Sequence, residues 1–148
     1  MTRTAIRVLA AAAIAAIAGA GAAPSVAEEA LSYQPLATPL FAGGETVIGQ
    51  AIAYPDGTAK VTAVIVTIPP GGETGWHMHP VPLYVHVLDG AVTVDYGDKG
   101  VKTFAAGESI LEAMDWPHNG RNDGDRPVRI LAVYIGAEGI DNAVGVAE

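Results

Sequence analysis

Three of the four histidines in this 148-residue chain are candidate metal ligands. His77 and His79 are separated by one residue, so their side chains lie on the same face if the segment is a β-strand. His118 lies far along the chain, and a β-barrel could bring it beside the first pair. Neutral imidazoles bind zinc, iron, nickel, copper and manganese. A His-x-His pair alone is a weak signal, because polar residues on an exposed strand give the same spacing.

The segments around these histidines predict an all-β fold. Short runs rich in β-branched and aromatic residues end in turn-forming sequences, as is typical of a barrel or a sandwich. The dipeptide Asp89-Gly90 predicts a tight hairpin after the strand that ends at Leu88. The expected strands cover residues 45–54, 60–68, 83–88, 91–96, 101–104, 109–113 and 128–135.

Residues 1–27 are expected to be a secretory signal peptide. Two early arginines precede an apolar run over residues 8–23, and small residues lead to a cleavage site after Ala27. An uncleaved membrane anchor is the alternative, but the run is shorter than the roughly 20 residues that a span needs. The mature chain would then be periplasmic or secreted and free of the membrane. It would comprise an N-terminal arm over residues 28–41 and one barrel domain over residues 42–148.

Composition and charge exclude several other classes of protein. The chain has no cysteine, so it has no disulfide framework, zinc–thiolate site, cysteine nucleophile or lipoprotein anchor. Its formal net charge of -8 disfavours nucleic acid and anionic membrane surfaces as partners. A small molecule is therefore the expected ligand, and a homodimer is an open alternative to a monomer.

Seven glycines, histidines and asparagines have the spacing of two known motifs: Gly71, His77, His79 and Gly90 in the first, and Gly107, His118 and Asn122 in the second. In this spacing the chain resembles the cupin superfamily. The resemblance implies a single jelly-roll β-barrel that holds one divalent transition metal, here zinc, iron, manganese or nickel. It implies His77, His79 and His118 as metal ligands.

Two departures from the family pattern bear on the metal. The glutamate expected in the first motif falls at Leu83, which we expect to face inward without binding a metal. The Pro-x-Gly of the second motif is replaced by residues 113–115. The site could then have three histidines only, recruit another carboxylate, or have lost the metal.

Glu112 is the candidate replacement carboxylate, as a fourth ligand or as a catalytic acid/base. It lies in an otherwise apolar strand, where a carboxylate needs either a partner or an exposed face. The chain is similar to small exported cupins that open with Gly-Trp-His-x-His-Pro, here residues 75–80, and carry a glutamate in the second motif. An exposed strand residue is the alternative. His86 is expected on the outer face, although nearby prolines could turn it inward as a ligand.

The resemblance leaves the function open between two classes. Three histidines leave coordination positions for a substrate, as a metalloenzyme of the dioxygenase, isomerase or lyase type requires. The other class is a non-catalytic barrel that binds a sugar or organic acid, or that only holds the metal. Arg121 could clamp a carboxylate, but we expect it to pair with Asp123 or Asp125.

Overall fold

A computed structural model describes residues 37–147 of the chain. The predicted signal peptide at residues 1–27 and most of the predicted arm lie outside the described residues. Residues Pro39–Glu148 form one compact unit. Among the described residues, no helix is long and apolar enough to cross a membrane.

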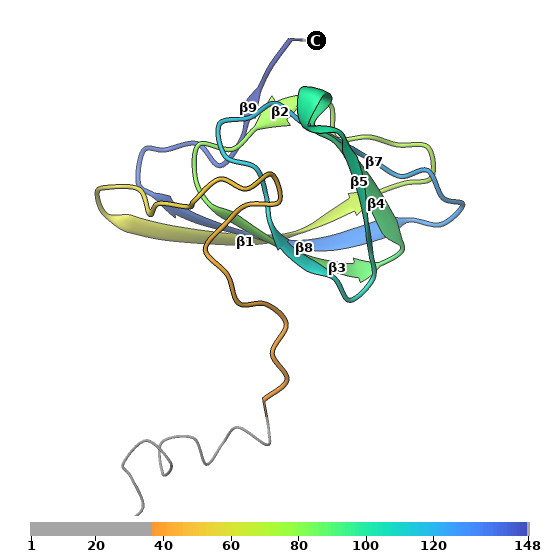
Figure 1. Cartoon of the computed structure of the whole chain (residues 1–148), viewed down its shortest axis with the longest axis horizontal. Helices are drawn as coiled ribbons and strands as arrows, with labels where there is room; N and C mark the ends of the chain where they lie inside the picture. Colours follow the sequence, from red (N-terminus) through yellow and green to blue (C-terminus); the bar gives the residue numbers. More distant parts are fainter. Residues whose placement is uncertain (1–36, 148) are drawn as a thin grey trace, which may run out of the picture. The chain divides into compact units, whose positions relative to one another are not determined.

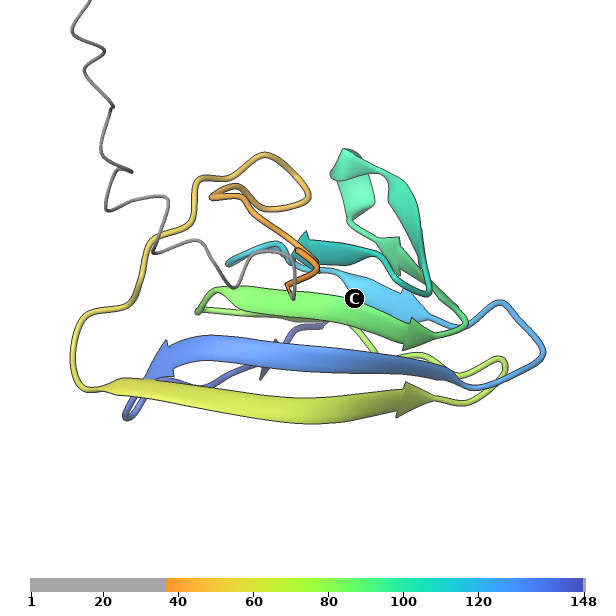
Figure 2. The ribbon, with the colours of Figure 1, turned by 90° about the horizontal axis from the view of Figure 1, so that it is seen from below.

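Two antiparallel sheets form the layers of this unit (Figures 1 and 2). Figure 2 shows strands β1, β8 and β3 side by side in one layer, with β4 and β5 in the other. The four-stranded sheet has the order β1 (Ala59–Ile68), β8 (Val128–Ala137), β3 (Leu83–Asp89) and β6 (Ser109–Leu111). The three-stranded sheet has the order β5 (Val101–Ala105), β4 (Ala91–Asp95) and β7 (Asn119–Arg121). A small third sheet pairs β2 (His77–Met78) with β9 (Val144–Gly145), and the 3-10 turn η2 (Gly97–Lys99) joins β4 to β5.

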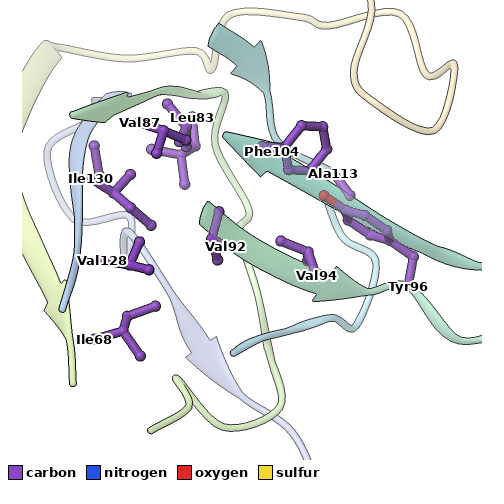
Figure 3. Packing of buried hydrophobic residues seen from close by; sticks show 12 residues of the cluster. Ile68, Leu83, Val87, Val92, Val94, Tyr96, Phe104, Ala113, Val128 and Ile130 are labelled. Carbon is purple, nitrogen blue, oxygen red and sulfur yellow. The ribbon is translucent and has the colours of Figure 1, made fainter. Parts of the chain in front are cut away.

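Alternation of side chains along the strands builds the core between the sheets. In β3, the residues Leu83, Val85 and Val87 are buried, whereas Tyr84 and His86 lie on the other face. The buried side chains of β8, β4 and β5 meet them in one hydrophobic cluster (Figure 3). The predicted all-β jelly-roll barrel is therefore confirmed.

The predicted strand over residues 45–54 is wrong. Only an isolated bridge between Glu45 and Ala51 forms there, because the chain reverses at a turn. The side chain of Thr46 stabilises this turn by accepting a hydrogen bond from the main-chain N–H of Gln50 at 3.1 Å. This segment is therefore a loop.

The predicted hairpin at Asp89-Gly90 is also wrong. Strand β3 pairs with β8 and β6, whereas β4 pairs with β5 and β7. The dipeptide therefore carries the chain from one sheet to the other. Gly90 has φ 77°, and a Cβ there would lie 3.0 Å from a methyl of Val128, so the corner requires glycine.

Candidate metal centre

His77 and His118 lie directly opposite each other as an antiparallel pair. The N–H of His77 donates to the carbonyl of His118 at 3.0 Å, and the N–H of His118 donates to the carbonyl of His77 at 2.9 Å. Residues paired in this way project their side chains from the same face, and the two ring centroids are 4.5 Å apart. Strand periodicity then adds His79 to that face, 4.8 Å from His77 and 5.0 Å from His118 between ring centroids.

The three imidazoles share a single tautomer that leaves one nitrogen free for a metal. The ligand nitrogens offered by the three rings lie within 4.8 Å of one another. In each ring, Nδ1 donates to a main-chain carbonyl: that of Gly75 at 2.8 Å for His77, Asn142 at 2.8 Å for His79, and Trp116 at 2.9 Å for His118. A carbonyl can only accept, so Nδ1 carries the hydrogen and Nε2 keeps its lone pair in the neutral ring. This is the state in which a histidine binds a metal.

Burial keeps these rings neutral. Desolvation lowers the pKa of all three histidines, and it lowers that of His79 to about 4 although the Asn142 carbonyl partly opposes it. The charges of His118 and His77 lower the pKa of His79 further. At neutral pH the cluster therefore presents lone pairs and no protons to a cation.

Glu112 lines the same cavity as the histidines. Its carboxylate oxygens do not belong to the group of possible metal-binding atoms that the three histidines form. Its N–H donates to the carbonyl of Leu83 at 2.9 Å, which extends the pairing of β6 with β3 and directs the side chain inward. The carboxylate is 6% exposed, and Oε1 accepts from the N–H of Ala113 at 2.7 Å. Burial raises the pKa of Glu112, while the Ala113 N–H, Tyr96 and His77 partly lower it. The alternative of an exposed carboxylate is therefore wrong.

Tyr96 is fully buried close to Glu112. Its hydroxyl makes no well-formed hydrogen bond within residues 37–147, although the nearby Glu112 carboxyl adds to the burial that raises the Tyr96 pKa. The ring lies 5.7 Å from that of His118 between centroids. An acidic side chain and a phenol thus lie together beside the histidines.

The cavity at this site has a volume of about 80 Å³. Leu83 faces into it and is 4% exposed, as predicted. Its remaining wall is mainly aliphatic and aromatic, with Thr74 and Tyr134 as further polar side chains. Donor set, tautomer and burial all fit a divalent metal held by His77, His79 and His118.

Comparison with known proteins agrees with this geometry. A family model described as a cupin domain matches residues 64–134. These residues form a cupin domain. The oxalate decarboxylase of Lactobacillus farciminis, solved as a formate complex, is similar with a TM-score of 0.51 and 25% identity, over 58% of this chain and 26% of its own. The DMSP lyase DddQ from Ruegeria pomeroyi DSS-3 is similar with a TM-score of 0.51 and 22% identity, over 58% of this chain and 43% of its own.

This chain thus spans less than half the length of either solved structure. No curated protein sequence matches it.

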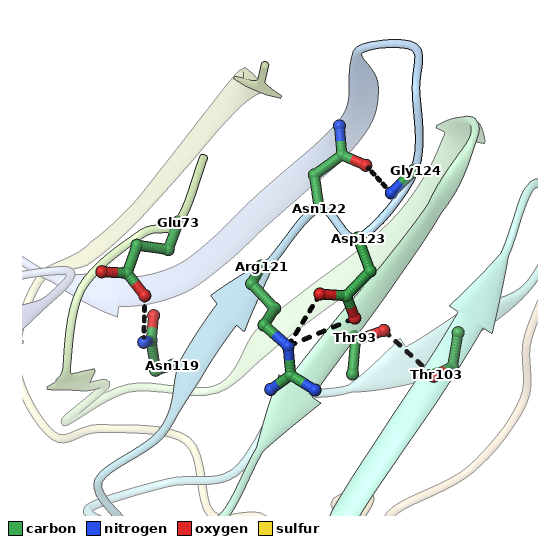
Figure 4. Close-up of polar contacts among 8 residues, drawn as sticks. All are labelled: Glu73, Thr93, Thr103, Asn119, Arg121, Asn122, Asp123 and Gly124. Carbon is green, nitrogen blue, oxygen red and sulfur yellow. Dashed lines mark hydrogen bonds and ion pairs between the residues drawn. The ribbon is translucent and has the colours of Figure 1, made fainter. Parts of the chain in front are cut away.

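Other polar residues near the cupin site have structural roles. His86 lies on the outer face, where Nδ1 is 2.8 Å from the hydroxyl of Ser109, and it is not part of the metal cluster. Arg121 pairs with Asp123 at 2.9 Å, as expected, so it is not a clamp for a substrate (Figure 4). Asn122 is buried, and its Oδ1 accepts from the N–H of Gly124 at 3.0 Å, which fixes the turn after β7.

Three residues that support the cupin site have no clear signal in the sequence. Gln50 binds both main-chain groups of Met114, donating to its carbonyl at 2.8 Å and accepting from its N–H at 3.0 Å, and so fixes the loop before His118. Asn142 acts through its carbonyl, which any residue type supplies. Asp115 has φ 47°, the left-handed conformation that glycine adopts without strain.

Proposed function

We propose that this chain is an exported metal-binding cupin that acts as a metalloenzyme on a small organic molecule. The strongest support is the convergence of three histidines whose Nδ1 atoms all donate to carbonyls, leaving three Nε2 lone pairs for one ion. A divalent transition metal would act there as a Lewis acid toward an oxygen of the substrate. The purified protein should hold about one zinc, iron, manganese or nickel ion per chain, and elemental analysis measures this. A protein that holds no metal and binds none of these ions would refute the proposal.

Glu112 is proposed to move a proton beside the metal. Its carboxyl lies in the cavity with the histidines, and burial raises the pKa of this carboxyl. The carboxyl does not belong to the group of possible metal-binding atoms that the three histidines form. A carboxyl whose pKa lies closer to neutrality is a better acid/base catalyst than an ordinary glutamate. The Ala113 N–H holds Oε1, so Oε2 is the atom left to exchange the proton. Direct coordination by Glu112 is the alternative role.

A non-catalytic barrel that holds a metal or a small ligand is the second candidate function. The small volume of the cavity and its apolar wall, which includes Leu83 and Val85, favour it. The two functions differ in turnover. A screen of small oxygen-containing compounds with the metal-loaded protein should detect product formation that Glu112→Gln abolishes, whereas the alternative predicts binding without product.

Export is the proposed route to the site of action. Residues 1–27 have the pattern of a signal peptide, and cleavage after Ala27 would give a mature chain that begins at Glu28. Mass spectrometry of the protein recovered outside the cytoplasm should find that N-terminus. An intact segment over residues 1–27 would instead support a membrane anchor.

A homodimer is proposed through the outer face of the four-stranded sheet. Strand β1 lies at the edge of this sheet and on its outer face exposes Val61 by 66% and Ile65 by 49%. Long apolar edge strands are usually covered by another chain or element. Light scattering should give twice the mass of one chain, and Ile65→Lys should reduce it to that of one chain.

A further inference from the structure

Unlike a typical site for a dianion, the cavity beside the histidines has no lysine or arginine among its described lining residues. Residues 37–147 contain six lysine and arginine side chains in total, and none of these six lines the cavity. Arg121 and Arg129 form exposed ion pairs with Asp123 and Asp89. A second carboxylate at the far end of a ligand would therefore be buried against aliphatic side chains without a counter-ion, which is costly.

The polar groups of the cavity lie close to the histidines or are already satisfied. Thr74 accepts from the N–H of Gly120 at 3.0 Å and donates to the carbonyl of Gly75 at 3.2 Å. Beyond the histidines, Glu112, Thr74 and Tyr134, the lining is apolar and comes from both sheets, with Val66, Val85 and Ile130 from one and Val92, Val94 and Phe104 from the other. Apart from these groups, the cavity therefore offers mainly apolar surface to a ligand.

The size of the cavity limits the ligand to a few carbon atoms. Its volume of about 80 Å³ is smaller than the roughly 150 Å³ cavity that holds benzene. A body of two to three carbons beyond the metal-bound group suits this space.

We infer that the site takes a small amphiphile, with one oxygen-bearing end at the histidine-bound metal and a short uncharged apolar body in the pocket around Val85 and Ile130. This inference rests on the proposed metal site and adds the class of ligand. It excludes dicarboxylates. The apolar wall should contribute affinity in proportion to the carbon surface that it buries.

Binding of simple carboxylates to the cobalt(II)-loaded protein tests the inference. Metal content is measured first, and visible absorption of the bound cobalt then gives each affinity. Propionate should bind about fourfold more tightly than acetate, because one methylene becomes buried. Butyrate should bind at least about tenfold more tightly than β-alanine, which has the same shape but ends in an ammonium group. Malonate should bind more weakly than propionate.

A matched pair of variants shows where the apolar body of the ligand binds. Val85→Thr keeps the shape of the wall but adds a hydroxyl, and it should lower propionate affinity severalfold without changing metal content. Val133→Thr makes the same change in β8, outside the cavity lining, and should have no effect. Equal or tighter binding of malonate or β-alanine, or no gain from acetate to propionate, overturns the inference while the metal site stands. A chain that binds no cobalt overturns both.

Discussion

His77 and His118 exchange both of their main-chain hydrogen bonds, so two ligands 41 residues apart in sequence form one rigid pair. Their separation is set by the ladder and is independent of the metal. We therefore expect the site to be formed before an ion arrives.

Removal of His118 should abolish metal binding. His118→Ala leaves two imidazoles, and the affinity for zinc should fall by more than about a hundredfold. His86→Ala removes a histidine from the outer face and should leave affinity unchanged. Elemental analysis after dialysis measures both. Equal loss in the two variants would mean that the histidines act only through folding.

Glu112→Gln and Glu112→Ala distinguish the two roles of the carboxylate. Both substitutions remove the charge, but only glutamine keeps the shape. The acid/base role predicts that both variants keep metal within about tenfold of the original affinity while turnover is lost. Loss of metal from both variants would instead identify Glu112 as the fourth ligand.

Leu83→Glu should tighten metal binding. Leu83 faces the cavity, so a carboxylate there adds a ligand at the position of the family glutamate. The metal-free variant should be less stable by several kcal/mol, because an unpaired carboxylate is buried, and the metal should restore most of this loss. Leu83→Gln is the control without charge. Thermal unfolding with and without zinc measures the effect, and a variant that unfolds and gains no affinity would show that Leu83 does not face the metal.

Acid should destabilise the metal-free protein. Because the pKa of His79 is lowered from 6.5 to about 4, the unfolded chain binds more protons between these values, so stability is lost as pH falls from about 6.5 to 4. His79 alone contributes on the order of 3 kcal/mol, and His77 and His118 act in the same direction. Urea unfolding at pH 7, 6 and 5 measures this.

Two variants separate the contributions to this pH dependence. His79→Gln should flatten the profile, because it removes the largest of the shifted groups. Glu112 has the opposite effect on stability. Because its pKa is raised, the protein becomes less stable as the pH rises above the ordinary carboxyl range, and Glu112→Gln should remove this loss of stability. A profile of the Glu112→Gln variant that is flat from pH 7 to 5 would contradict the burial of the histidines.

Asp115→Gly should stabilise the loop before His118. Asp115 has φ 47°, and glycine adopts this conformation without strain, so we expect a gain of up to about 1 kcal/mol in the free energy of unfolding. Asp115→Ala keeps a Cβ without the local bonding of an aspartate and should lose about 0.5–1 kcal/mol. Chemical unfolding of the metal-free protein gives both values, and equal stability of all three chains would exclude strain at this position.

Long strands with strict alternation were predictable from the sequence. Leu83, Val85 and Val87 alternate with polar or aromatic neighbours, and that pattern alone gives both the strand and its buried face. Strands β2, β7 and β9 have only two or three residues each, too few for a period, and they include His77 and flank His118. The sequence therefore predicted which histidines meet but not how they are held.

The wrong hairpin prediction and the open question of where Glu112 points have the same physical cause. Asp89-Gly90 has the local chemistry of a hairpin, but the burial of β3 on β8 and of β4 on β5 takes the two strands to different sheets. The inward direction of Glu112 likewise depends on the pairing of its N–H with Leu83. Such long-range pairing has no local signature in the chain.

The bond from His79 to the carbonyl of Asn142 has a consequence for the order of events in folding. The two residues are separated by 63 positions, and the closure of so long a loop is slow compared with the formation of local turns. The His77–His118 pair can form earlier, but the third imidazole acquires its fixed tautomer only when the segment after β8 docks. Before that step, His77 and His118 are oriented, whereas the side chain of His79 is free to rotate. The chain therefore becomes able to bind a metal with all three histidines only late in folding, after most of the barrel has formed.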